Sequence, residues 1–247
     1  MNVFSAKGSS PPVFAAARAY SQLAGREVKV SVCQHGCGPD GECGPPGSDG
    51  FTPEVLGGEY DMAVAGSESD MDELDRTGKT IKASRRSLGI RQAALLVPRG
   101  NPAGIATLED LTRPGIRIAI STIDCMRAVW EDVAGRAGLI EEVRANLTHK
   151  VTGCIAFMDV IARKKVDAGI GWSSFARMNP GLVAIDLPPE LRVYRSTCIT
   201  ILERCQDVAA AEAFVAYLLA EQGQATFAGL GWLPRGFAPG RTPAAAR

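Results

Sequence analysis

Short apolar runs alternate with amphipathic segments along almost the whole chain, and this alternation constrains the fold more than any other feature. Helical spacing of apolar residues follows Pro11 and Pro12, and it returns over residues 153–164 and 209–221. Runs typical of buried strands stand at residues 28–32, 61–65, 93–97, 116–120, 168–171, 182–187 and 196–202. Strands that alternate with helices predict an α/β fold with mostly parallel sheets and helices on both faces.

Length and composition limit the function classes. A chain of 247 residues with 46% hydrophobic and 22% charged residues is long enough for one large domain or two lobes. Lys and Arg together number 27, and so do Asp and Glu, so no bulk charge attracts nucleic acid or an acidic membrane. No apolar run reaches the roughly 18–20 residues that span a bilayer. The start MNVFSAKG lacks the features of a secretion signal, which predicts a cytosolic protein or one whose leader has been removed.

A Gly/Pro-rich loop directly after the strand at 28–32 holds Cys33, His35, Cys37 and Cys43. Such a density of thiols indicates soft-metal ligation, redox chemistry or a disulfide. The spacing of these cysteines differs from the paired CxxC motifs of standard zinc sites. His35 is either a ligand contact or a solvated loop residue, so the loop alone leaves its chemistry open.

Four blocks resemble one family over nearly the whole chain. They are VFSAKGS, LLVPRGNPAGIATLEDLTRPGIRIAI, KKVDAGIGW and AEAFVAYLLAEQGQATFAGLGW, and their order is similar to that of the periplasmic molybdate-binding proteins of ABC transporters. The resemblance implies a type 2 periplasmic-binding fold, in which two lobes close like a flytrap on a ligand in the cleft between them. Lobe I would be residues 1–84 plus 195–247, and lobe II residues 87–190.

The resemblance also implies which loops hold the ligand. Helix N-termini present backbone N–H groups and a positive dipole end, so neutral donors can bind an oxyanion such as molybdate or tungstate. Position by position, the family's loops correspond to 5–10, the loop after 28–32, 121–126, 151–154 and 171–173 in this chain. The expected ligand-binding residues are Lys7, Ser9, Cys33, His35, Cys125, Val151, Thr152, Cys154 and Trp172.

Three of these loops carry a cysteine in or beside them, namely Cys33, Cys125 and Cys154. A thiol is a weaker hydrogen-bond donor than a hydroxyl, and thiolates favour soft ions. The three cysteines are therefore a candidate site for a thiophilic metal or metalloid, and the ligand is expected to differ from plain molybdate. Packing against a core or a helix end is the alternative role of Cys125 and Cys154, while Cys198 is expected to be a core residue.

The resemblance implies an extracytoplasmic, monomeric solute-binding protein, and no catalytic residues are expected. No Ser-His-Asp elbow, Walker A loop, HExxH or GxGxxG motif follows a strand. Its partners would be a small inorganic ligand and an ABC permease or a sensor kinase, and nucleic acid is not expected. No cofactor is expected beyond a bound oxyanion or soft metal ion. The alternatives are a metal or metalloid sensor and a cysteine-dependent enzyme on the same fold.

Overall fold

The computed structural model describes residues 1–33, 50–122 and 124–239. Its helices and strands follow one another in the order β1 (Asn2–Ser5), α1 (Ser10–Ala24), β2 (Lys29–Val32), α2 (Phe51–Gly57), β3 (Met62–Ala65), α3 (Glu68–Arg76), β4 (Arg86–Pro98), β5 (Ile118–Ser121), α4 (Val129–Ala137), α5 (Ile140–Ala145), β6 (Leu147–Val151), α6 (Cys154–Ala162), β7 (Ala168–Trp172), α7 (Phe175–Met178), β8 (Leu182–Asp186), β9 (Tyr194–Ile201), α8 (Val208–Leu219) and α9 (Glu221–Gly229). The expected alternation of strands and helices is confirmed.

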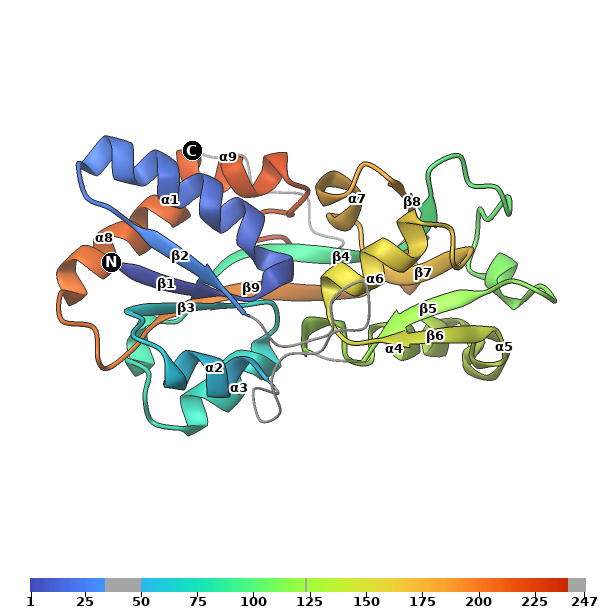
Figure 1. Ribbon diagram of the computed structural model, residues 1–247, viewed down its shortest axis with the longest axis horizontal. Helices are drawn as coiled ribbons and strands as arrows, with labels where there is room; N and C mark the ends of the chain where they lie inside the picture. The colour runs from blue at the N-terminus through green and yellow to red at the C-terminus, as the bar shows by residue number, and fades with distance from the viewer. Residues whose placement is uncertain (34–49, 123, 240–247) are drawn as a thin grey trace.

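The strands form a curled sheet with the order β2-β1-β3-β9-β4-β7-β5-β6, and β8 pairs with β4. The pairings of β1 with β2 and β3, and of β5 with β6 and β7, are parallel. The antiparallel pairings among these strands all involve β4 or β9. Two sets of parallel strands are therefore joined by two long antiparallel strands, which run lengthwise through the middle of the molecule (Figure 1).

The sheet of the first half is buried on both faces. In β1 and β3, alternate residues enter opposite cores: Val3 and Met62 pack with α1, α8 and α9, while Phe4 and Ala63 pack with α2 and α3. This is the period of two that a strand imposes on its side chains. In Figure 1, α1, α8 and α9 accordingly lie on one side of these strands, and α2 and α3 lie on the other.

The second half has its own core, whose buried residues all fall between Ala93 and Val193. The buried residues of the other two cores all lie before residue 89 or after residue 197. The chain passes between the halves along β4, which pairs with β9 through Gln92 and with β7 from Ala93 onwards. This is the two-lobed α/β arrangement that the sequence predicted. The proposed lobe boundaries at residues 84/87 and 190/195 stay predictions.

Local sequence explains the ends of the first long helix. Pro11 and Pro12 lie in the first turn of α1, where a missing N–H costs nothing, and Gly25 ends the helix with φ of 64°. The expectation for 93–97 was too short, because β4 begins at Arg86 with polar residues that pair with β9. The strand β6 was not anticipated at all, since its alternation of half-buried and exposed residues in LTHKV lacks an apolar run.

Candidate functional site

A fully buried arginine, Arg91, lies on β4 where this strand passes from one half to the other. Its Nη2 donates to the carbonyl oxygen of Gly66, and its Nη1 donates to the Cys125 sulfur at 3.3 Å. The guanidinium carbon lies 4.7 Å from the centre of the Trp172 ring, a cation–π contact. Every one of these contacts is made to a group that can be neutral.

No carboxylate of the described residues forms an ion pair with Arg91, and its Nε has no hydrogen-bond partner there. Burying a charged side chain without a counter-charge costs several kcal/mol, so such groups are normally paired. The guanidinium fork fits two oxygen atoms of a carboxylate, sulfate or phosphate group. The geometry therefore favours a negatively charged ligand at Arg91.

The first half contributes two glycines that lie directly against this arginine. A Cβ atom built at Gly8 would lie 3.0 Å from the Cys154 sulfur and 3.6 Å from Arg91 Nη1. A Cβ atom built at Gly66 would lie 2.8 Å from Arg91 Nη2 and 2.8 Å from the Cys125 Cβ. The loops after β1 and β3 thus touch the second half at Arg91 and at both cysteines, which describes a closed arrangement of the two halves.

The second half contributes Cys125 and Cys154, whose sulfur atoms lie 3.9 Å apart. This separation is well beyond the S–S bond length of about 2.05 Å. Cys125 belongs to the 3-10 helix after β5, and Cys154 is the first residue of α6. The helix start follows Gly153, which has φ of 98°. The N-terminal end of α6 carries the positive end of the helix dipole, which would stabilise an anion bound near Arg91.

Several buried donors near the expected ligand loops have no protein partner among the described residues. They are Ser9 Oγ on the loop after β1, Ser121 Oγ at the end of β5, and Trp172 Nε1 and Ser174 Oγ at the end of β7. Buried polar atoms are nearly always hydrogen-bonded, so each such donor requires an explanation. Ligand oxygens that accept from some of these groups would provide one.

The other expected ligand residues have more modest positions. Lys7 is half-buried, and its backbone N–H donates to the Cys33 sulfur at 3.1 Å. Val151 and Thr152 are half-buried just before α6, and the Val151 carbonyl accepts from Thr122 N–H at 3.2 Å. His35, together with Cys37 and Cys43, lies outside the described residues.

The expected three-cysteine metal site is not assembled among the described residues. Cys33 packs in the core beneath α2 and α3, while Cys125 and Cys154 belong to the core of the second half. No group of three or more His, Cys, Asp and Glu side chains is placed to hold a metal ion in the part of the chain that the structure describes. The guanidinium of Arg91 beside Cys125 also repels a cation, which explains why this geometry suits an anion better.

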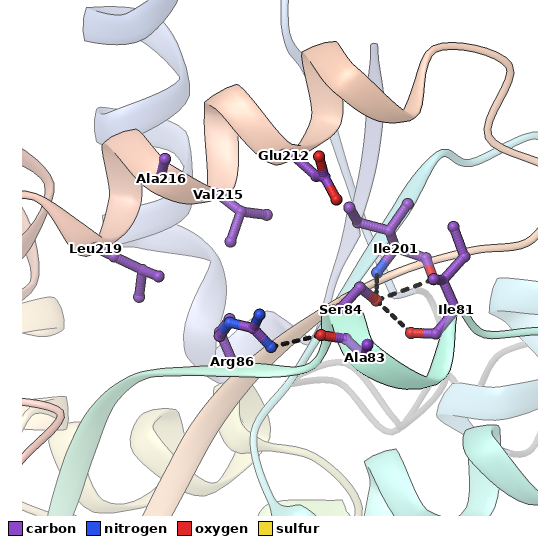
Figure 2. A pocket seen from close by; sticks show the side chains of 9 residues that line it. All are labelled: Ile81, Ala83, Ser84, Arg86, Ile201, Glu212, Val215, Ala216 and Leu219. Carbon is purple, nitrogen blue, oxygen red and sulfur yellow. Dashed lines mark hydrogen bonds between the residues drawn. The ribbon is translucent and has the colours of Figure 1, made fainter.

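A separate pocket of about 260 Å³ lies between α8 and the start of β4 (Figure 2). It is lined by Ile81, Ala83, Ser84, Arg86, Ile201, Glu212, Val215, Ala216 and Leu219. Its arginine, Arg86, is exposed and already donates to the backbone carbonyls of Ala83 and Arg85. This pocket therefore lacks the buried, uncompensated charge that distinguishes Arg91.

Arg91 is the functional candidate that reasoning from the sequence missed. Its signal was present, because an arginine stands at the start of the apolar run IRQAALLV, inside a strand. Charged residues are almost never fully buried unless they are paired. An arginine within a core strand is therefore a candidate for ligand contact.

Comparisons with known proteins agree with this fold. A model of the family described as bacterial extracellular solute-binding protein matches residues 1–233. The sulfate-binding protein of Synechococcus elongatus is 24% identical over 215 residues, which cover 76% of this chain but 61% of the length of that relative.

Solved structures resemble the chain over nearly its whole length. PEB3 of Campylobacter jejuni, in its L-phospholactate complex, has a TM-score of 0.79 and 24% identity and covers 94% of this chain and 99% of PEB3. The periplasmic molybdate-binding protein of Azotobacter vinelandii has a TM-score of 0.74 and 17% identity, with 94% and 98% covered. The sulfate-binding protein SubI of Mycobacterium tuberculosis has a TM-score of 0.77 and 18% identity, with 95% and 86% covered.

Within the described residues, no helix is long and apolar enough to cross a membrane. The family match spans both halves of the molecule and all but the last 14 of the 247 residues. The chain belongs to the family of bacterial extracellular solute-binding proteins.

Proposed function

We propose that this protein captures a small oxyanion between its two halves, outside the cytoplasm, and delivers it to an ABC permease. The observation that carries this proposal is the fully buried guanidinium of Arg91, which has no carboxylate partner in the described part of the chain. A bound anion would supply the missing negative charge.

The two halves would share the ligand. Arg91, the N-terminus of α6 and the buried serines Ser9 and Ser121 provide charge and hydrogen-bond donors from both sides of the junction. Binding would favour the closed arrangement, because the anion offsets the cost of burying the arginine only when the halves meet. The permease would then recognise the closed form, and a sensor kinase is the alternative receiver.

Three kinds of relative support an oxyanion in particular. The relatives named above carry sulfate, molybdate or L-phospholactate in their names or structures. These ligands share a compact anionic group with several oxygens, which suits the guanidinium fork of Arg91. The two adjacent sulfurs favour the thiophilic metal alternative, but the neighbouring guanidinium cation of Arg91 disfavours it.

Isothermal titration calorimetry on the full chain tests the proposal. Sulfate, molybdate, tungstate and phosphate would be titrated alongside Zn²⁺ and arsenite. Removing one side of a buried charge contact costs roughly 2–5 kcal/mol, so Arg91→Gln should weaken anion binding at least about thirtyfold. Arg99→Gln is the matched control, because Arg99 stands at an exposed position just after the same strand.

Two results would refute the proposal. One is binding of Zn²⁺ or arsenite by a protein that binds none of the four oxyanions. The other is oxyanion binding that Arg91→Gln and Arg99→Gln leave equally unchanged in proteins with wild-type thermal unfolding.

A further inference from the structure

Two sulfur atoms lie beside the buried arginine at the junction of the halves, and the oxyanion proposal does not use their chemistry. Cys125 and Cys154 are 29 residues apart in sequence, yet their sulfurs are 3.9 Å apart. A movement of about 2 Å would bring them to the S–S bond length. Cys125 lies in a short 3-10 helix and Cys154 on the first turn of α6, so modest loop adjustments can supply that movement.

Both sulfurs lie in surroundings that stabilise negative charge. The Cys125 sulfur accepts a hydrogen bond from the guanidinium of Arg91. Cys154 is at the N-terminus of the nine-residue helix α6, where the backbone dipole favours an anion. Cysteines next to arginine or at helix N-termini are the reactive ones, because the thiolate is the nucleophile.

Cys198 provides a contrast within the same chain. Cys198 is also buried, but burial, together with its hydrogen bond to Glu68, raises the pKa of its thiol to about 12. Its neighbours therefore hold it in the neutral form. Cys125 differs from Cys198 in its hydrogen-bond partner, which is the guanidinium of Arg91 and not a carboxylate.

We propose that Cys125 and Cys154 form a redox-active dithiol, which closes to a disulfide at the ligand site with Arg91 as the group that activates Cys125. The first thiolate attacks a disulfide R–S–S–R, which forms a mixed disulfide and releases one thiol RSH after protonation. The second thiolate then displaces the other RS group, and the Cys125–Cys154 bond forms. The dithiol loses two electrons and two protons, and R–S–S–R is reduced to two RSH.

The oxidant is a small or protein disulfide, of the class that maintains oxidised thiols outside the cytoplasm. The supply of this oxidant and its access to the site rest on the proposed function, whereas the thiol chemistry itself needs no bound oxyanion. Gly8 and Gly66 lie over the two cysteines, so the reagent reaches them when the halves separate. Ligand-induced closure would accordingly slow the oxidation.

The test uses the reduced full chain and oxidised glutathione as the probe. Alkylation and peptide mass mapping should show a Cys125–Cys154 linkage and a mass loss of two hydrogens, with Cys198 still alkylatable after unfolding. Arg91→Gln should slow formation of the linkage roughly tenfold, the size of one lost charge-assisted hydrogen bond. Arg91→Lys should restore part of the rate, because it keeps the positive charge. Cys198→Ser is the matched control and should leave the rate unchanged.

Three outcomes would overturn the inference. They are a stable glutathione adduct on Cys125 or Cys154 without the internal linkage, a linkage of either residue to another cysteine, and a linkage rate that Arg91→Gln leaves unchanged in a folded protein. Circular dichroism and thermal unfolding establish folding for each variant. Titration of the reduced protein with sulfate and molybdate is scored separately, so failure of the oxyanion proposal is distinguishable from failure of the dithiol.

Discussion

Replacing Gly66 by alanine should introduce a steric clash that pushes the two halves apart. In the closed arrangement the new methyl group would lie 2.8 Å from Arg91 Nη2, 2.8 Å from the Cys125 Cβ and 3.0 Å from the Cys125 sulfur. Real Cβ atoms do not approach other atoms so closely, so the halves or the arginine must shift. Gly66 is not among the glycines with positive φ, so the effect is steric and does not come from backbone strain.

The magnitude follows from the cost of overpacking. An added methyl group in a tightly packed site costs typically about 1–3 kcal/mol. In the proposed capture mechanism the halves separate without ligand, so the cost would fall on closure and appear in ligand affinity. We therefore expect Gly66→Ala to weaken oxyanion binding by roughly 5- to 150-fold, with little change in the thermal unfolding of the protein without ligand.

A graded series makes the measurement specific. A Cβ atom built at Gly8 meets its nearest neighbour, the Cys154 sulfur, at 3.0 Å, so Gly8→Ala should weaken binding less than Gly66→Ala. Gly229 in α9 has nothing within 4 Å of its built Cβ, so Gly229→Ala is the control and should leave binding unchanged. Calorimetry gives the affinities, and small-angle X-ray scattering gives the compaction on ligand addition. Equal affinities for Gly66→Ala and Gly229→Ala would refute the reasoning.

Three further predictions concern stability and thiol chemistry. The hydrogen bond from Arg117 lowers the pKa of Asp167, so this pair stabilises the fold above the ordinary carboxyl pKa, and the contribution is lost as pH falls through the lowered value. The urea stability gap between wild type and Asp167→Asn should therefore be present at neutral pH and vanish in acid; a gap that persists in acid would contradict this. Because burial raises the pKa of Cys198 to about 12, native protein at about pH 8 should resist iodoacetamide at this position, which peptide mapping would check. Trp232 Nε1 donates to the buried hydroxyl of Thr197 at 2.9 Å, so Trp232→Phe should lower the free energy of unfolding by about 1–3 kcal/mol in urea titrations, and an unchanged midpoint would exclude this role.

The two-lobed fold could be predicted because its strands are short apolar runs that alternate with helices. Buried parallel strands such as β3, with the sequence MAVA, need hydrophobic residues on both faces, which makes them conspicuous in a sequence. The half-buried β6 has no such run and escaped prediction. The polar first part of β4 did so as well, because its partner β9 is more than 100 residues away in sequence.

The candidate site was predicted in part. The resemblance placed Cys125 and Cys154 in loops around one ligand, and the structure brings their sulfurs together at 3.9 Å. Cys33 packs in a core of the first half, whereas Cys125 and Cys154 belong to the core of the second half. Sequence spacing carries no information on which way such a side chain packs, and the apolar run IRQAALLV marks Arg91 as a candidate without giving its contacts to Gly66, Cys125 and Trp172.

The burial of Arg91 explains why closure of the two halves would depend on the ligand in the proposed capture mechanism. In an open protein, water can solvate the guanidinium, whereas the closed arrangement surrounds it with Gly66, Cys125 and Trp172. Closing without an anion therefore pays the desolvation cost of a charge that hydrogen bonds to neutral groups only partly offset. A penalty of about 3 kcal/mol is enough to keep the closed form of the empty protein near 1%. In the proposed mechanism an oxyanion on Arg91 would remove this penalty, so the closed form that a permease would recognise would report that ligand is present. A site built from neutral donors alone would close without this penalty, because its closure buries no uncompensated charge.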